Sequence, residues 1–429
     1  MRKRIRYCLV FVALCFTAAV ITAGDKETAH ASAKEVVVLR VDGAIGPAIA
    51  GYITSNIRDC AATDTEALVL SMDTPGGLDA ATREIVKAIL NASVPVVTYV
   101  SPEGARAASA GTYILYSSHI AAMAPATNLG AATPVQMGGG SPVPSPDGKP
   151  GEESRPEEDK SEEEQEAQEE ESEAEPASDM KAKRKKVVND AAAYIRGLAE
   201  KRNRNAAWAE KAVREAVSLT STEALDKNVI EVIARDFNDL LEQIDGRRVQ
   251  VQGEDVTLNT ASADIRHVEQ NWRTKLLAAI TNPNVAYILL LVGIYGLLLE
   301  GYNPGAIVPG VVGAISLLLA LYALQVLPVN YIGVGLILLG GILMFAEALV
   351  PSFGALGIGG VVSVVMGGIM LIDTDIPGFA ISFEIIIAVG AITGLSFLAV
   401  LCFLIGAKRR PVVSGQEQIT GKTGTALKD

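Results

Sequence analysis

The pattern of apolar and polar residues divides the chain into short alternating elements followed by long apolar runs. Residues 36–39, 67–71 and 94–100 are short apolar runs, typical of strands buried on both faces of a sheet. Residues 78–90, between the second and third runs, carry apolar side chains at helical spacing with acidic residues in the early turns. Strands that alternate with helices predict an α/β domain with parallel pairing across residues 35–136.

The chain is almost continuously apolar from residue 283 to residue 407. Runs close to the ~20 residues that a spanning helix needs predict an all-α, multi-pass membrane domain of about five transmembrane helices. The basic cluster Lys408-Arg409-Arg410 follows the last run, and five spans place it opposite the N-terminal domain, as the positive-inside rule prefers. The apolar runs cover approximately residues 284–300, 305–326, 331–350, 354–372 and 381–407.

An internal repeat with a spacing of 47 residues supports this view of the membrane domain. It predicts two copies of a helix–glycine turn–helix element. Each copy has a glutamate at the end of a span, which indicates either a polar cluster within the membrane or carboxylates that pack helix ends. We favour the second interpretation. The repeated positions are Glu300, Pro304, Gly310, Gly313 and Ser316, which return as Glu347, Pro351, Gly357, Gly360 and Ser363.

Residues 1–33 have the pattern of an export signal. A basic stretch, residues 2–6, precedes an apolar stretch, residues 7–23, and small residues offer cleavage near Ala23, Ala31 or Ala33. An uncleaved anchor is the alternative, since the apolar stretch is long for a signal. Both readings predict a multi-pass protein of the cell membrane with the α/β domain outside the cytoplasm.

An acidic insertion interrupts the α/β pattern at residues 138–180. Residues 141–180 hold sixteen Asp and Glu against three Lys and Arg, so this segment accounts for the formal charge of -12. Such a sequence cannot bury a core and is expected to be disordered. Helical spacing resumes after Lys181–Lys186, and the predicted α/β domain covers residues 34–250. Residues 251–282 are expected to be a linker.

The composition excludes several classes of function. Mean hydropathy is +0.29, which is high for a soluble chain of 429 residues. Four Cys and three His argue against a disulfide scaffold and a zinc module, so no metal or other cofactor is expected. The sequence has no basic face with interleaved aromatic residues, so it does not indicate nucleic-acid binding.

Two small-residue segments carry the candidate chemistry. Asp73-Thr-Pro-Gly-Gly77 follows a predicted strand and opens a helix, where exposed backbone N–H groups favour an oxyanion. Ser109 stands in Ala107-Ala-Ser-Ala-Gly-Thr-Tyr-Ile114, where a tight strand–helix junction would expose its hydroxyl. The alternatives are a common turn and close helix packing. His119 and His267 have no obvious Asp partner, so a desolvated Lys is the more plausible base for a serine nucleophile.

Together, these two segments resemble the NfeD family of long, membrane-bound serine proteases, whose domains are similar to those of the ClpP/crotonase superfamily. The stretch Asn189–Ile195 and the membrane elements at Glu300 and Glu347 match the same family. The resemblance runs from about residue 35 to the end of the chain. It implies a ClpP/crotonase-like α/β fold and a serine endopeptidase.

The resemblance also implies roles for particular residues. Ser109 and Lys186 correspond to a catalytic Ser-Lys dyad, with Lys185 as the fallback base. Gly77 and Ala110 would supply the oxyanion amides, and Pro75, Gly76 and Gly111 would form the substrate loop. The implied partner is a stomatin- or flotillin-like membrane protein cleaved at a hydrophobic segment, and the implied assembly is a homodimer of the protease domain.

The sequence departs from the family pattern in two places. The acidic insertion separates Ser109 from Lys186, so the segment that bears the base is expected to move until substrate binds. Residues 408–429 form a basic tail and the start of an OB-like domain that is absent or truncated. A non-catalytic scaffold for stomatin-like proteins is therefore the alternative function, and an acyl-CoA enzyme is disfavoured because acyl-CoA is cytosolic.

Overall fold

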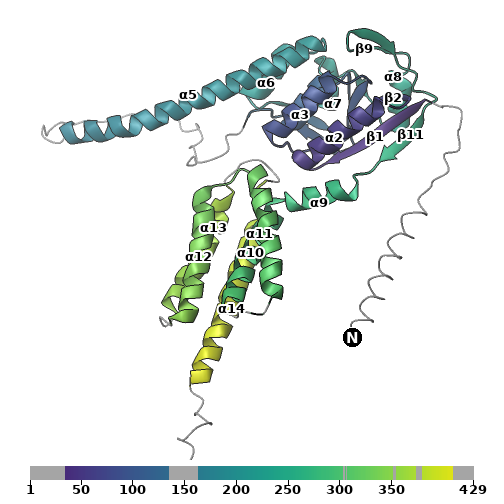
Figure 1. The fold of residues 1–429 in the computed structure, drawn as a ribbon. Coiled ribbons are helices and arrows are strands. Elements are labelled where there is room, and N and C mark those ends of the chain that lie inside the picture. The colour runs from purple at the N-terminus through teal and green to yellow at the C-terminus, as the bar shows by residue number, and fades with distance from the viewer. Residues whose placement is uncertain are drawn as a thin grey trace, which may run out of the picture.

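The computed structural model describes residues 34–134, 163–302, 305, 307–350, 354–372 and 379–408. The expected export signal, residues 135–162 of the insertion region and the C-terminal tail from residue 409 lie outside these ranges. Figure 1 shows an α/β domain, a long helix that projects from it, and a bundle of apolar helices. The helix α9 (Trp272–Ile280) connects the α/β domain to the bundle.

A six-stranded sheet forms the centre of the α/β domain, and every neighbouring pair of strands is parallel. The expected α/β architecture is thus confirmed. The apolar runs became strands because both faces of the sheet are covered, and β3 is buried at all five positions. In spatial order the strands are β11 (Asp264–Val268), β1 (Glu35–Asp42), β2 (Thr65–Asp73), β3 (Val96–Val100), β5 (Ile120–Met123) and β8 (Val232–Ile233).

Helices cover the two faces of the sheet and enclose two apolar clusters. The larger cluster lies under α2 (Pro47–Cys60), α3 (Asp79–Leu90), α4 (Ala110–Ser117) and the C-terminal part of α5 (Glu163–Lys201). The smaller cluster lies under α8 (Phe237–Ile244). The remaining elements are α6 (Ala206–Arg214), α7 (Ser221–Asp226), the hairpin of β9 (Arg248–Val251) and β10 (Glu254–Thr257), and a small sheet of β4 (Arg106–Ala108), β6 (Asn128–Gly130) and β7 (Ser218–Thr220).

The expected linker at residues 251–282 is wrong, because this segment completes the α/β domain. It contains β10, β11 and α9, and β11 pairs with β1 at the edge of the sheet. Much of β11 is exposed, so its sequence lacks the apolar run that identified the inner strands. Backbone pairing and an ion pair between Arg266 and Glu35 hold this edge strand.

The structure also differs from the expected disorder at residues 138–180. α5 begins at Glu163, so residues 163–180 have a helical backbone. Glu, Ala and Gln have high helix propensity, and this run is continuous with the packed C-terminal part of the helix. The acidic composition argued against a buried core in this segment but did not exclude a helical backbone.

Five apolar helices follow α9 in the described part of the chain. Two of them, α10 and α11, are long and apolar enough to span a membrane by length and composition, and α12, α13 and α14 contain shorter apolar stretches. The count of five spans remains a prediction. The helices are α10 (Pro283–Tyr302), α11 (Val308–Val326), α12 (Tyr331–Leu349), α13 (Ala355–Leu371) and α14 (Phe383–Lys408).

The sequence repeat corresponds to two similar helix pairs. A methyl group on Gly293 would lie 2.8 Å from Leu317 Cα, and one on Gly340 would lie 2.7 Å from Val364 Cγ2. Gly340 and Val364 lie 47 residues after Gly293 and Leu317. The pair α10–α11 and the pair α12–α13 therefore make equivalent close contacts. The Glu347 carboxylate accepts bonds from the Gly354 and Leu356 amides, which supports the interpretation that it packs a helix end.

His119 makes the stability of the α/β domain depend on pH. Burial, followed by the nearby cations Arg202 and Arg204, lowers the pKa of His119 to about 3. Below pH ~6.5 the unfolded chain takes up a proton that the folded protein excludes, so the free energy of unfolding falls as the pH falls. We expect a loss of about 2 kcal/mol between pH 6.5 and pH 5 from this group, measured by urea unfolding.

The matched variant His119→Asn keeps an acceptor for the Val96 amide, which donates to His119 Nδ1 at 3.1 Å. Between pH 6.5 and pH 5, the unfolding free energy of this variant should fall by about 2 kcal/mol less than that of the wild type. The variant His267→Asn serves as the control for the loss of a histidine elsewhere in the domain. Equal slopes for wild type and His119→Asn would contradict the prediction.

Candidate active site

Ser109 lies at a strained junction between β4 and α4. Its backbone angles are φ 50° and ψ -109°, a region that a non-glycine residue rarely occupies. The Ser109 amide donates to the Gly130 carbonyl at 3.0 Å, and Thr112 Oγ1 donates to the carbonyls of Gly130 and Ala107 at 3.0 Å each. These bonds hold the junction in place, and they leave the serine half-buried.

The segment that follows β2 runs beside this junction. Thr74 N donates to Arg106 O at 2.8 Å, and Ala108 N donates to Thr74 O at 3.1 Å. The Asp73 carboxylate accepts a further bond from the Arg106 amide at 3.0 Å. The two small-residue segments identified in the sequence are therefore neighbours in space.

Three glycines are required by close approaches within this site. A methyl group on Gly76, where φ is 126°, would lie 2.8 Å from Ser109 Cβ. A methyl group on Gly77 would lie 2.2 Å from Ile45 O, and one on Gly111 would lie 2.7 Å from Thr74 Cγ2. Since no Cβ atom fits at these distances, only glycine permits this packing.

The same packing leaves hydrogen-bonding groups available around Ser109. Ile45 pairs with the glycine segment through Ile45 N to Gly76 O at 2.8 Å and Leu78 N to Ile45 O at 2.9 Å. Within the described ranges, the amides of Gly77 and Ala110 and the hydroxyl of Ser109 have no hydrogen-bond partner. A hydroxyl beside two available amides is an arrangement that can support acyl transfer.

Lys186 is exposed on α5 and has no described contact with Ser109. It lies one turn before Asp190, whose carboxylate pairs with Arg83 of α3 at 2.8 Å. Tyr194 stacks on Tyr113 of α4 at 6.1 Å, so this part of α5 is attached close to the helix that Ser109 opens. The structure brings Pro75, Gly76, Gly77, Ala110 and Gly111 together around Ser109, but it leaves Lys186 and Lys185 on the surface.

Neither histidine is placed to act as a base for Ser109. His119 follows α4 and Ser109 precedes it, so the helix, about 12 Å long, separates the two residues. His119 also uses its Nδ1 to accept from the Val96 amide. His267 lies on the edge strand β11, where it contacts Phe237. No group of three or more potential metal ligands occurs in the described ranges.

Sequence reasoning missed three residues that shape the site. Thr74 Oγ1 accepts from the Gly76 amide at 3.1 Å, Ile45 pairs with the glycine segment, and Gly130 accepts from Ser109. Thr74 is adjacent to the glycine motif and could have been considered as a turn-stabilising hydroxyl. Ile45 and Gly130 carry no local signal, because their roles arise from segments distant in sequence.

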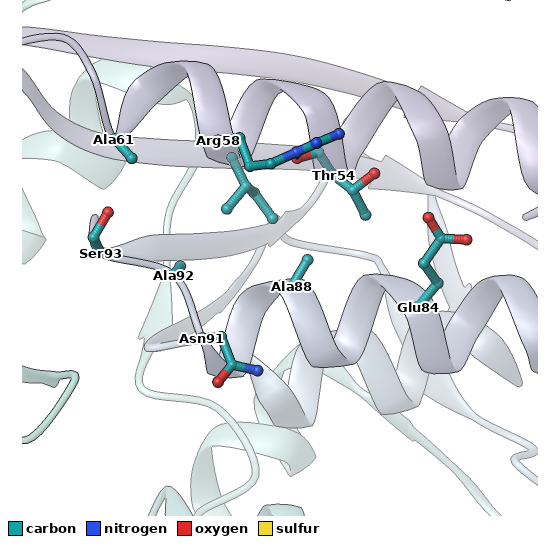
Figure 2. Close-up of a pocket in the computed structure, with 9 residues that line it drawn as sticks. Thr54, Arg58, Ala61, Glu84, Ala88, Asn91, Ala92 and Ser93 are labelled. Atoms are coloured by element: carbon teal, nitrogen blue, oxygen red, sulfur yellow. The ribbon is translucent and has the colours of Figure 1, made fainter.

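A separate shallow groove of about 450 Å³ lies between α2 and α3. Figure 2 shows Arg58 and Thr54 on one side of it and Glu84 and Asn91 on the other. Its lining contains no nucleophile paired with a base. The groove is lined by the later turns of α3, whereas Gly77 lies beside the first turn of that helix. The groove is therefore not part of the Ser109 site.

Two family descriptions match the chain. The NfeD1b N-terminal domain matches residues 35–143, and the NfeD integral membrane domain matches residues 284–403. Among solved structures, a serine-to-alanine variant of the 1510-N membrane-bound stomatin-specific protease is 33% identical, with a TM-score of 0.44 over 56% of this chain and 99% of that chain. A lysine-to-alanine variant in complex with a substrate peptide is 32% identical, with a TM-score of 0.46 over 58% and 98%.

Curated relatives match over most of their length. The membrane-bound protease PH1510 of Pyrococcus horikoshii is 34% identical over 88% of this chain and 78% of that protein. The membrane protein NfeD1b of Bacillus subtilis is 24% identical over 79% of this chain and 68% of that protein. With this identity and coverage, and with matches in both the α/β and the membrane regions, the chain belongs to the NfeD family.

Proposed function

We propose that this protein is a membrane-bound serine endopeptidase. The observation that carries the proposal is the strained Ser109, held beside Gly76 with the unpartnered amides of Gly77 and Ala110 close by. The relative PH1510 bears the name of a membrane-bound protease, which agrees with this chemistry. Ser109 is the nucleophile, and Pro75, Gly76 and Gly111 shape the loop that receives the substrate.

The reaction proceeds through an acyl-enzyme. Ser109 Oγ attacks the peptide carbonyl carbon while its proton passes to neutral Lys186 Nζ, and the Gly77 and Ala110 amides bind the oxyanion. The protonated Lys186 then gives its proton to the leaving amine as the peptide bond breaks. Water attacks the ester with Lys186 again accepting a proton, and this releases the second product and restores Ser109.

The exposure of Lys186 implies that the substrate completes the site. Lys186 is exposed in the free protein, and an apolar peptide bound over it would exclude water from the site. Hydrophobic segments are therefore the substrate class, and a stomatin- or flotillin-like membrane protein is the partner. The same proposal includes the ClpP-like character of the fold, a homodimer, five spans and an extracytoplasmic α/β domain. The C-terminal boundary of the α/β domain moves from residue 250 to residue 268, because β11 belongs to the sheet.

The competing function is a membrane scaffold that binds stomatin-like proteins without cutting them. The exposure of Lys186, which has no described contact with Ser109, is the observation that favours it. The two functions differ in the fate of the partner, since a scaffold tolerates the loss of the Ser109 hydroxyl.

Replacing either member of the dyad should abolish cleavage. In the full chain reconstituted in vesicles, we expect Ser109→Ala to lower kcat/KM for hydrophobic peptides by about 10⁴-fold and Lys186→Ala by about 10²–10⁴-fold. The measurement is cleavage of a peptide panel followed by mass spectrometry. The exposed residues Ser93 and Lys87, changed to Ala, are the matched controls and should retain activity. Equal activity of wild type and Ser109→Ala would refute the protease.

A methyl group on Gly76 should inactivate the site while the domain remains folded. Gly76→Ala places a Cβ within 2.8 Å of Ser109 Cβ and strains a residue with positive φ, so we expect at least a ~10²-fold slower reaction of Ser109 with a fluorophosphonate probe. Gly51→Ala in α2 is the control, since no atom lies within 4 Å of the added methyl group. Labelling of Gly76→Ala at the wild-type rate, with circular dichroism unchanged, would argue against this geometry.

A further inference from the structure

The helix α9 packs on the α/β domain with one face and touches α10 and α11, while another face has no partner among the residues that the structure describes. α9 lies against α2, and Tyr52 of α2 donates a hydrogen bond to Val268 O just before α9. Thr274, Leu277 and Ala278 are half-buried, yet no residue of α9 is fully buried. α9 thus covers the α/β domain on one side only.

The unpartnered face carries large apolar side chains. Trp272 is 69% exposed and Leu276, one turn later, is 50% exposed. At ~100° per residue, these two side chains and Ala279 fall within about 60° of one another, opposite the half-buried residues. A single exposed leucine is ordinary, but a tryptophan and a leucine aligned on one helix face form an apolar stripe.

Basic residues border this stripe. Arg273 lies beside the Trp272 ring at 5.5 Å from its centroid, and Lys275 is 60% exposed while paired with Glu269. Tryptophan flanked by Lys and Arg is the composition of helices that lie in the headgroup layer of a bilayer. The basic groups suit anionic phospholipids, whereas the stripe suits the upper acyl chains.

Continuity with the membrane domain determines where this face points. α9 ends at Ile280, and the apolar helix α10 begins at Pro283. In Figure 1, α9 crosses between the α/β domain and the end of the bundle, with α2 on the side of the α/β domain. The side opposite α2 therefore faces the plane in which the spanning helices leave the membrane.

We propose that α9 lies in the phospholipid headgroup layer, with Trp272 and Leu276 inserted, and holds the α/β domain flat on the bilayer. The occupant of this surface is lipid. The domain is then restrained at two points, by α10 within the membrane and by α9 on its surface, which fixes the height of Ser109 above the bilayer.

The chain contains two tryptophans, which makes a direct test possible. Trp208→Phe leaves Trp272 as the sole fluorophore of this kind. In vesicles of phosphatidylcholine and phosphatidylglycerol, lipids brominated near the headgroup end of the acyl chain should quench Trp272 by at least about twofold. Lipids brominated near the chain terminus should quench it less.

The matched control is Trp272→Phe, which leaves the buried Trp208, stacked on Tyr116, beyond the reach of both lipids. Aqueous iodide should quench Trp272 strongly when the protein is diluted in detergent without brominated lipid. It should quench Trp272 weakly when the protein is in vesicles. Absence of quenching by either brominated lipid overturns the proposal. If the Trp272 emission is then blue-shifted, the stripe is covered by protein, such as a second copy of the chain.

A separate contact connects the membrane domain to the candidate active site. Phe379 lies in the connection before α14 and is only 5% exposed. A methyl group on Gly46, the residue before α2, would lie 3.5 Å from the Phe379 ring. Ser382 and Asn284 exchange hydrogen bonds of 2.8 and 3.2 Å, so this connection is attached to the start of α10.

The Phe379 contact lies at Gly46, next to the residue that pairs with the glycine segment. Gly46 follows Ile45, and Ile45 forms the paired bonds with Gly76 O and Leu78 N. From this arrangement we infer that Phe379 is a positioning residue that supports the Ile45 segment and thereby the Gly77 amide. The effect of Phe379 on catalysis rests on the proposed protease function. The contact between Phe379 and Gly46 does not depend on that function.

Hydrogen exchange tests this inference without requiring activity. In the full chain in vesicles, Phe379→Ala should speed exchange of the Leu78 amide by about tenfold, while Phe379→Leu should restore much of the protection. Phe383, which is 61% exposed at the start of α14, provides the control variant Phe383→Ala. Unchanged exchange in Phe379→Ala overturns the inference whether or not the wild type cleaves peptides.

Where the wild type does cleave, the same variant should lower kcat by about tenfold with KM within twofold. A purely structural defect would instead lower the folded fraction and be visible in the circular dichroism spectrum. An inactive wild type with faster Leu78 exchange in Phe379→Ala would reject the protease and retain the positioning contact.

Discussion

The site depends on how closely two backbone segments can approach each other. Gly76 and Gly77 lie between Ile45 on one side and Ser109 on the other, at separations that leave no room for a Cβ. This approach brings two amides from different segments near one hydroxyl. It also holds Ser109 in a strained backbone conformation that the bonds from Ser109 N and Thr112 to Gly130 stabilise. The sheet matters because it fixes β1 and β2, which lead into Ile45 and the glycine segment, rigidly enough to hold these separations.

Much of this arrangement could be predicted from the sequence, since its signals are local. The buried parallel strands are apolar runs, and the glycine segment directly follows one of them, while the serine segment comes a few residues after the next. Ile45 and β11 could not be predicted in the same way. Ile45 is one apolar residue among many, and β11 is an exposed edge strand held largely by backbone pairing. Their roles depend on contacts with segments that are distant in the chain.

The membrane domain shows a second kind of predictability. A spacing of 47 residues in the sequence became equivalent contacts in space, because close approach of two helices demands small residues at fixed positions. The glutamates of the repeat then accept backbone amides at the turns, Gly305 for Glu300 and Gly354 for Glu347. Within an apolar bundle, such bonds satisfy amides that neither helix can satisfy by itself.

The exposure of Lys186 constrains how the site could be regulated. In the proposed protease, Lys186 is exposed in the free protein, so cleavage of bystander peptides is disfavoured until an apolar segment covers both residues. The contacts of α5 with α3 and α4 attach the segment that carries Lys186 beside the helix that Ser109 opens. A site attached to the membrane at α9 and Gly46 would meet such apolar segments as they leave the bilayer. Selectivity for membrane partners would then follow from desolvation of the base as much as from contacts with particular side chains.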